Sequence, residues 1–327
     1  MKSDNVLGIV LRADQTESIH HGHIAVVQPN GNLVFSLGNP DFKTFFRSSM
    51  KPFQAASVIV TGAAERYLFT PQEIALIAGS HSAEPKHLKG VKEILKKGGI
   101  PPSALYCGPA LPFYAPALRK LLASGGKPSR LHHNCSGKHA GLLAAAKTFG
   151  NFRDYYSTKH QIQKLIFKIV SEYCDVSFKP EDFGIDGCAL PNMSLPLRSM
   201  ALGFARLGEE FGETAVGIVG KSMSKHPWYV GGTKRFDTEL MQAIPGMVAK
   251  GGAEGLFCIS IPKEEIGIAI KCEDGAFRAL AVIALQLLVK LGIASSAGAK
   301  NILKKHPQWN QILNSRKEKV GEIVPSF

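Results

Sequence analysis

The chain lacks any long run of apolar residues. No stretch of its 327 residues approaches the roughly 18 apolar residues that a membrane-spanning helix needs. Residues 1–10 show neither the apolar core nor the small-residue cleavage site of a secretory signal. We therefore expect a cytoplasmic protein with no membrane partner. In that reducing compartment the six cysteines, none in a CxxC pair, are not expected to form disulfides.

Signatures of nucleic-acid binding are also missing. The formal net charge is +13, which by itself suits a polyanionic partner. However, the chain has no RNP-like motif, no zinc-finger spacing and no dense Lys/Arg tract with interleaved aromatic residues. We therefore expect no nucleic-acid partner. A non-catalytic basic protein that binds polyanions is retained as an alternative.

What the sequence does contain predicts an α+β (α/β) fold. The hydrophobic fraction of 45% and charged fraction of 20% are those of a globular chain with a sizeable core. β-rich segments occur near both ends, at residues 6–11, 23–28, 33–37, 247–249, 255–261 and 267–271. The turn sequence PNGN at 29–32 predicts a hairpin. We expect one antiparallel sheet built from both termini.

Helical patterns fill the middle of the sequence. Apolar periodicity predicts helices at 50–64, 71–78, 85–97, 115–124, 137–147, 159–173, 197–207 and 214–224, with a further apolar helix at 277–291. The expected division is a sheet-plus-helix region at 1–46 and 245–327. A mainly helical region at 47–244 is inserted and carries most of the active site.

The most informative local pattern is an S-x-x-K pair, Ser48 and Lys51, after Arg47. Residues at i and i+3 share one helix face, so a neutral lysine there can activate a serine nucleophile. The pair alone also fits an ordinary surface helix. The penicillin-binding pattern adds S-D-N and K-T-G after the S-x-x-K. Here SDN occurs upstream at 3–5, and K-T-G is absent, with GTK in reverse at 232–234.

Four other segments are candidate site loops. Residues 79–84 (GSHSAE) are small and polar and suit a loop that lines a site, although Ser82 as the N-cap of the next helix is an alternative. Residues 132–139 (HHNCSGKH) concentrate metal-ligand types in no common zinc spacing. Residues 184–191 (GIDGCALP) place a cysteine in a turn. Lys263 ends a late strand.

In combination these segments resemble the asparaginase family typified by the Rhizobium enzymes. The segments RSSMKPFQ, GSHSAEPKH, HHNCSGKHAG, GIDGCALP and GGTKRFDTELM occur in that family's order over nearly the whole chain. The resemblance implies a β-lactamase/glutaminase-like fold, a homodimer and hydrolysis of L-asparagine to L-aspartate and ammonia. It also implies Ser48 as nucleophile with Lys51 as base, a second pair of Ser80 and Lys263, and Zn²⁺ bound by Cys135, Lys138 and Cys188.

The expected substrate contacts follow from this resemblance and from chemistry. Arg47 suits a bidentate clamp on the α-carboxylate, and Asp186 suits the role of holding the α-ammonium group or of orienting a zinc ligand. His139 is a further candidate for substrate binding. A penicillin-recognising or β-lactamase-like serine hydrolase, and a glutaminase, remain alternatives within the same chemical class.

Overall fold

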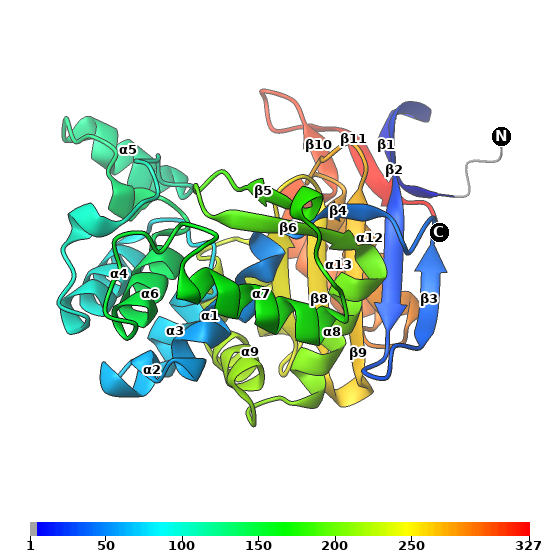
Figure 1. Ribbon diagram of the computed structural model, residues 1–327. Coiled ribbons are helices and arrows are strands. Elements are labelled where there is room, and N and C mark those ends of the chain that lie inside the picture. The colour runs from blue at the N-terminus through cyan, green and yellow to red at the C-terminus, as the bar shows by residue number, and fades with distance from the viewer. Residues whose placement is uncertain (1–4) are drawn as a thin grey trace.

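A large antiparallel sheet is the centre of the molecule (Figure 1). Within residues 5–327, which the computed structural model describes, it has eight strands in the order β10–β11–β1–β2–β9–β8–β7, with β3 paired to β2. The strands are β1 (Val6–Arg12), β2 (Gln15–Val27), β3 (Leu33–Leu37), β7 (Val248–Gly252), β8 (Leu256–Ile261), β9 (Ile266–Cys272), β10 (Gln311–Leu313) and β11 (Lys319–Pro325). The prediction of one sheet built from both ends of the chain is confirmed.

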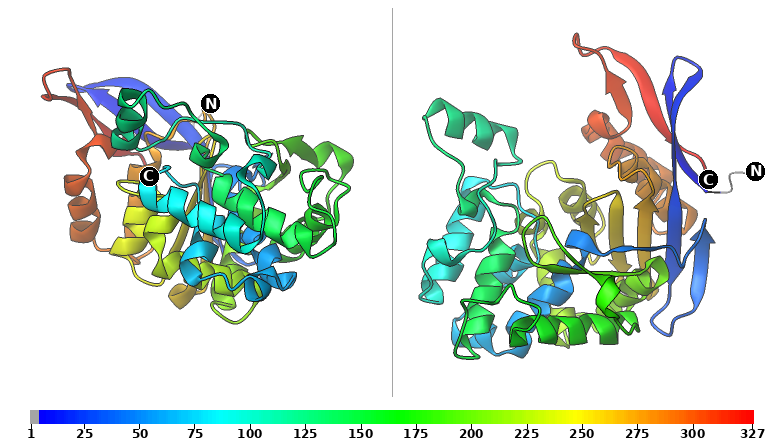
Figure 2. Two further views of the ribbon diagram at one scale, coloured as in Figure 1. Left: turned by 90° about the vertical axis from the view of Figure 1, so that its left-hand side faces the viewer. Right: turned by 45° about the horizontal axis from the view of Figure 1, so that its top comes forward.

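The two ends of the sequence meet in this sheet. β1 pairs antiparallel with β11, with Gly8 opposite Pro325 and Arg12 opposite Gly321. The β2–β3 hairpin turns where PNGN predicts it, with Gly31 at a φ of 90°. β2 begins well before the predicted segment because its polar first half pairs with β1. The ribbons β1–β2 and β10–β11 extend away from the body (Figure 2).

The inserted segment forms a helical layer on one side of the sheet. α8 packs directly on β9, β8 and β2, and the backbones approach so closely that a Cβ at Gly267 would lie 1.9 Å from the Ala201 carbonyl oxygen. The helices of this layer are α1 (Lys51–Val60), α2 (Ala63–Arg66), α3 (Pro71–Ile77), α4 (Pro85–Lys97), α5 (Ala115–Ala123), α6 (Ser136–Lys147), α7 (Gln161–Cys174), α8 (Leu197–Glu209), α9 (Ala215–Lys225), α10 (Pro227–Val230) and α11 (Phe236–Ala243).

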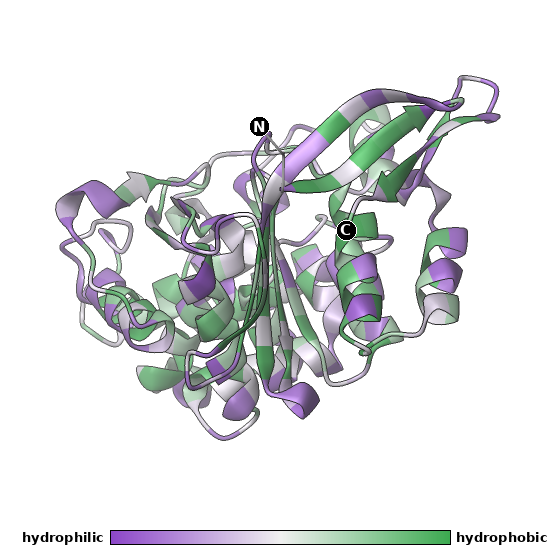
Figure 3. Cartoon of the chain, turned by 90° about the vertical axis from the view of Figure 1, so that its right-hand side faces the viewer, coloured by the Kyte–Doolittle hydropathy of each residue, from purple (hydrophilic) through white to green (hydrophobic). Residues whose placement is uncertain are grey.

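The other side of the sheet carries α12 (Leu280–Lys290) and α13 (Ser296–Lys305). α12 contacts β1, β9 and β11. Seen along the sheet, the central strands are mostly hydrophobic and have helices on both sides (Figure 3). Burial on both faces explains why these strands read as continuous apolar runs. In the part of the chain that the structure describes, no helix has the length and apolar character required to cross a bilayer.

A second, small sheet was not expected from the sequence. It has the order β4–β6–β5, with β4 (Lys43–Phe45), β5 (Phe183–Ile185) and β6 (Pro191–Pro196). Its antiparallel pairs join the segment before the S-x-x-K pair to both sides of the GIDGCALP loop. The small sheet therefore brings two of the candidate site segments together.

Candidate active site

The candidate site is a cavity of about 610 Å³ between the helical layer and the sheet. Ser48 and Ser80 contribute to its wall together with Asn134. The other lining residues come from the segments before α5 and after α10, the start of α11, the end of β7, the β7–β8 turn and β8, the start of α12 with the residues before it, and the short 3₁₀ turn η6 (Pro307–Trp309). They are Phe113, Lys234, Arg235, Phe236, Asp237, Gly251, Gly252, Ala253, Phe257, Phe277, Arg278, Leu280, Ala281, Gln308 and Trp309.

Ser48 and its neighbour Ser49 have different surroundings. Both lie in a short 3₁₀ helix, η1 (Arg47–Met50), directly before α1. Ser48 is half-buried and lines the cavity, whereas Ser49 is fully buried and donates a hydrogen bond to the Lys250 carbonyl oxygen at 2.9 Å. Ser48 is therefore the hydroxyl of this pair that a substrate can reach.

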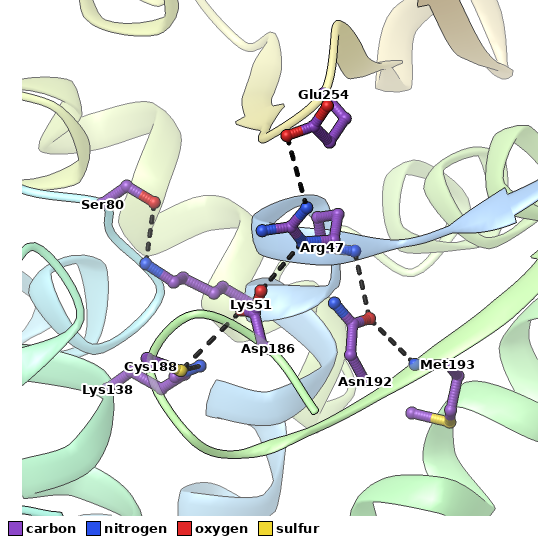
Figure 4. A network of polar contacts seen from close by, with 9 residues as sticks. All are labelled: Arg47, Lys51, Ser80, Lys138, Asp186, Cys188, Asn192, Met193 and Glu254. Atoms are coloured by element: carbon purple, nitrogen blue, oxygen red, sulfur yellow. Dashed lines mark hydrogen bonds and ion pairs between the residues drawn. The ribbon is translucent and has the colours of Figure 1, made fainter. Parts of the chain in front are cut away.

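Ser80 lies between two buried lysine amines. Lys51 Nζ donates to Ser80 Oγ at 2.7 Å (Figure 4). Lys51 Nζ also donates to the Gly79 carbonyl oxygen at 2.7 Å, and Lys250 Nζ donates to Ser80 Oγ at 2.9 Å. Burial lowers the pKa of both lysines. For Lys250, burial and the neighbouring Lys51 lower the pKa to about 7. A neutral Lys250 amine is accordingly accessible near neutral pH.

The predicted partner of Ser80 was wrong. Lys263 lies in the exposed 3₁₀ turn η5 (Pro262–Glu264) beyond the end of β8, and Ser80 is bonded instead to Lys250 on β7. Sequence reasoning missed Lys250. Its available signal was a lone lysine inside the apolar strand MVAKGG, where a solvated side chain is not expected.

Cys135, Lys138 and Cys188 form one buried cluster. Lys138 Nζ donates to Cys188 Sγ at 3.1 Å. A hydrogen bond from the Cys188 thiol holds the pKa of Cys135 well below its usual value, assisted by Lys51 and Lys138. Among residues 5–327, no three His, Cys, Asp or Glu side chains gather into a metal site. The expected zinc set differs from such a group because its third donor is a lysine.

Arg47 and Asp186 form an ion pair beside this cluster, with Arg47 Nε donating to Asp186 Oδ1 at 2.8 Å (Figure 4). Burial opposes ionisation of Asp186, but Lys138 and Arg47 hold its pKa below the usual value. Arg47 has a φ of 49°, a strained value for a non-glycine residue. Its N–H donates to Asn192 Oδ1 on β6, which fixes this backbone.

His139 does not line the cavity. It is fully buried on α6, and its Nδ1 lies 2.6 Å from the Tyr155 hydroxyl. Burial lowers its pKa well below the usual value, with Lys138 adding to the effect. The structure therefore places His139 against Tyr155 and outside the lining of this cavity.

The GSHSAE loop is fixed to the segment after α10. Ser82 Oγ donates to the Gly231 carbonyl oxygen at 2.8 Å, and Glu84 accepts from the Thr233 N–H and hydroxyl, both at 2.7 Å. The N-cap residue of α4 is Glu84, so the alternative role of Ser82 as a cap was wrong. The reversed GTK segment thereby reaches the cavity, where Lys234 contributes to the wall.

A cavity lined by two serine hydroxyls, one of them, Ser80, hydrogen-bonded to two buried lysines with lowered pKa values, is typical of a serine hydrolase. The family model described as L-asparaginase II matches residues 9–325, almost the entire chain. The chain belongs to the L-asparaginase II family.

The chain also matches several solved structures with low similarity. One is a presumed beta-lactamase from Bacteroides dorei, with 13% sequence identity and a TM-score of 0.41 over 83% of this chain and 87% of that chain. Another is a beta-lactamase from Mycobacterium bovis, with 14% identity and a TM-score of 0.36 over 87% of this chain and 94% of that chain. A native form of Mglu also matches, with 14% identity and a TM-score of 0.38 over 84% of this chain and 61% of that chain. Likenesses this low assign no function. A comparison with curated proteins gave no match.

Proposed function

We propose that the protein hydrolyses L-asparagine to L-aspartate and ammonia through an acyl-enzyme on Ser48. Two observations support this proposal. The chain belongs to the L-asparaginase II family, and the cavity is lined by both Ser48 and Ser80, whose hydroxyl two buried lysine amines contact. The second observation carries the mechanism, because it supplies both a nucleophile and a proton path.

In the proposed reaction, Ser48 Oγ attacks the side-chain amide carbon of the substrate and loses its proton to neutral Lys51. The proton then passes through Ser80 to neutral Lys250, since both amines are hydrogen-bonded to the same hydroxyl. This proton is then transferred to the side-chain amide nitrogen of the substrate as the C–N bond breaks, and ammonia leaves. Water then cleaves the ester. Backbone N–H groups around Ser48 are proposed to bind the oxyanion, which typically contributes about 10²–10³ in rate per donor.

The substrate's charged groups require fixed partners, and the Arg47–Asp186 pair supplies one of each sign. We propose that Arg47 binds the α-carboxylate and Asp186 the α-ammonium group. Because Nε of Arg47 is already bonded to Asp186, the rest of the guanidinium is proposed to contact the carboxylate.

We also propose Zn²⁺ at Cys135, Lys138 and Cys188. Two thiols, one with a strongly lowered pKa, and an amine in one buried cluster are a suitable donor set. Lys138 must lose a proton to bind, although Cys188, Cys135 and Asp186 outweigh burial and raise its pKa. Bound zinc would supply Lewis-acid anchoring of a polar substrate group.

Metal content tests the zinc proposal. Cys135→Ser and Cys188→Ser are expected to lose the zinc found in the wild type by elemental analysis. Cys272→Ser, at a buried thiol on β9 outside the cluster, is the matched control and is expected to retain it. Equal zinc in all four proteins would place the metal elsewhere.

The decisive experiment for the activity is ammonia release from L-asparagine and L-glutamine by wild type, Ser48→Ala and Ser49→Ala. We expect release from asparagine that disappears in Ser48→Ala and persists in part in Ser49→Ala. Faster release from glutamine would favour the glutaminase alternative. No release from either substrate, with zinc supplied, would refute the proposal.

A further inference from the structure

The cavity is larger than a free amino acid requires. Its volume of about 610 Å³ is within the roughly 300–1,000 Å³ of pockets that hold drug-sized ligands. The Arg47–Asp186 pair and the thiol cluster do not line it, whereas Ser48 and Ser80 do. Besides the Arg47–Asp186 region proposed for the aspartyl group, the serines therefore adjoin a second space, which is the cavity itself.

Aromatic side chains form much of the wall of this second space. Phe236 packs against Phe257, with ring centroids 5.0 Å apart, and edge-on against Trp309 at 5.1 Å. Phe113 lies under the Arg235 guanidinium at 5.7 Å, and Phe277 is more than half exposed. Such a wall suits an aromatic or apolar group of a ligand.

Three cations, Lys234, Arg235 and Arg278, border the same space, with Asp237 as the acidic lining residue. Arg278 is held in place by a buried histidine. Its Nε donates to His20 Nε2 at 3.0 Å, and His20 Nδ1 lies 2.6 Å from Asp274 Oδ2. His20 is 2% exposed. A positioned guanidinium beside aromatic rings suits a carboxylate attached to an apolar group.

We propose that the cavity binds the amine half of a larger amide, in which the side-chain carboxyl of aspartate is joined to an aromatic amino acid. The aromatic ring packs among Phe236, Phe277 and Trp309, and Arg278 binds the carboxylate. This inference rests on the proposed function, because it uses the same nucleophile.

The chemistry is the same hydrolysis with a different leaving amine. Ser48 Oγ forms an ester bond with the aspartyl carbonyl carbon, and the C–N bond to the amino acid breaks. The nitrogen takes the proton that Ser48 lost and leaves as the free amino acid. One water molecule then cleaves the ester, so the products are aspartate and the aromatic amino acid.

The test measures kcat/KM for β-aspartyl-phenylalanine, its C-terminal amide, β-aspartyl-glycine and L-asparagine. For the wild type we expect β-aspartyl-phenylalanine to exceed β-aspartyl-glycine about tenfold or more, as one apolar group discriminates in a pocket. We also expect kcat/KM for β-aspartyl-phenylalanine to exceed that for its C-terminal amide. Arg278→Gln should remove the preference for the acid over the amide, and Phe277→Ala should reduce the preference over glycine. Arg316→Gln, at an exposed arginine in the β10–β11 turn, should change neither ratio.

The outcomes separate this inference from the proposed function. If asparagine is hydrolysed and β-aspartyl-phenylalanine is no better than β-aspartyl-glycine, the inference is overturned and the asparaginase activity stands. Turnover of the aromatic dipeptide without turnover of asparagine would support the inference and refute asparagine as substrate. If no amide is hydrolysed, both fail.

Discussion

One hydroxyl oxygen, Ser80 Oγ, is hydrogen-bonded to two lysine amines that are both fully buried. Two ammonium groups so close together and so deeply buried would repel strongly, which favours the neutral form of at least one of them. In the proposed mechanism, this repulsion between the two lysines is what provides a base in the site. It also makes Lys250 as important to the proposed chemistry as Lys51.

Replacing Lys250 should therefore suppress turnover. We expect Lys250→Met to lower kcat by about 10²–10⁴, the usual contribution of a positioned proton-transfer group. Lys263→Met, at the exposed turn after β8, is the matched control and should change kcat by less than about twofold. Ammonia release under saturating substrate is the measurement. The opposite ranking of the two variants would restore Lys263 to the site.

The pH dependence should follow the same lysine. Lys250 must be neutral to receive the proton, and burial together with Lys51 lowers its pKa to about 7, whereas Asp237 acts in the opposite direction. Below that pH the amine is protonated, so kcat/KM should fall by about tenfold per pH unit, and above it the profile should level off. A profile measured from pH 5 to 9 for wild type and Lys263→Met should show this acidic limb in both. A flat profile below pH 7 would exclude a neutral Lys250 from the mechanism.

At the level of elements, the close contact between α3 and α6 fixes the geometry of two site segments. The GSHSAE loop follows α3, and α6 begins with the residues after Cys135. A Cβ added at Gly137 would lie 2.6 Å from the Leu76 carbonyl oxygen, so only glycine fits there. Because Gly137 lets α6 approach α3 this closely, it also sets the distance between Ser80 and the thiol cluster.

Gly137→Ala should push these two helices apart. We expect the free energy of unfolding to fall by about 1–3 kcal/mol, as for other overpacked sites, despite the better helix propensity of alanine. Gly108→Ala is the control, because a Cβ there meets nothing within 4 Å. Urea unfolding measures both variants. Equal stability of the two would mean that the helices shift without cost.

The elements differ in how far the sequence alone predicts them. α4, with its amphipathic pattern, was predicted at its true bounds, and α3 and α7 to within two residues. β4 and β5 have three residues each, too few for an alternation to be visible. Ser80 and Lys51 were found because their motifs are local. The contact of Ser80 with Lys250 spans 170 positions and depends on strand order, which no local pattern encodes.

For the whole molecule, the pairing of β1 with β11 completes the sheet. A chain that ends after Glu318 would lack β11 and leave the polar groups of β1 and β10 without their partner strand. We expect this truncated protein to aggregate or to unfold without a cooperative transition. Arg316→Gln, in the full-length chain, should behave as wild type in thermal unfolding. A soluble, cooperatively unfolding truncation would show that β11 is dispensable.

The expected homodimer and cytoplasmic location remain predictions at this scale.

The pairing of the first and last strands also has a consequence for how the chain is made. On the ribosome β1 emerges early, whereas β7, β8 and β9 follow only after the whole helical layer, and β11 follows last of all. During synthesis the helical layer is therefore present before the sheet is complete, and the face of α8 that packs on β8 and β9 is still exposed. Contacts between such distant segments form slowly, so newly synthesised chains should depend on chaperones more than the stability of the finished protein would suggest.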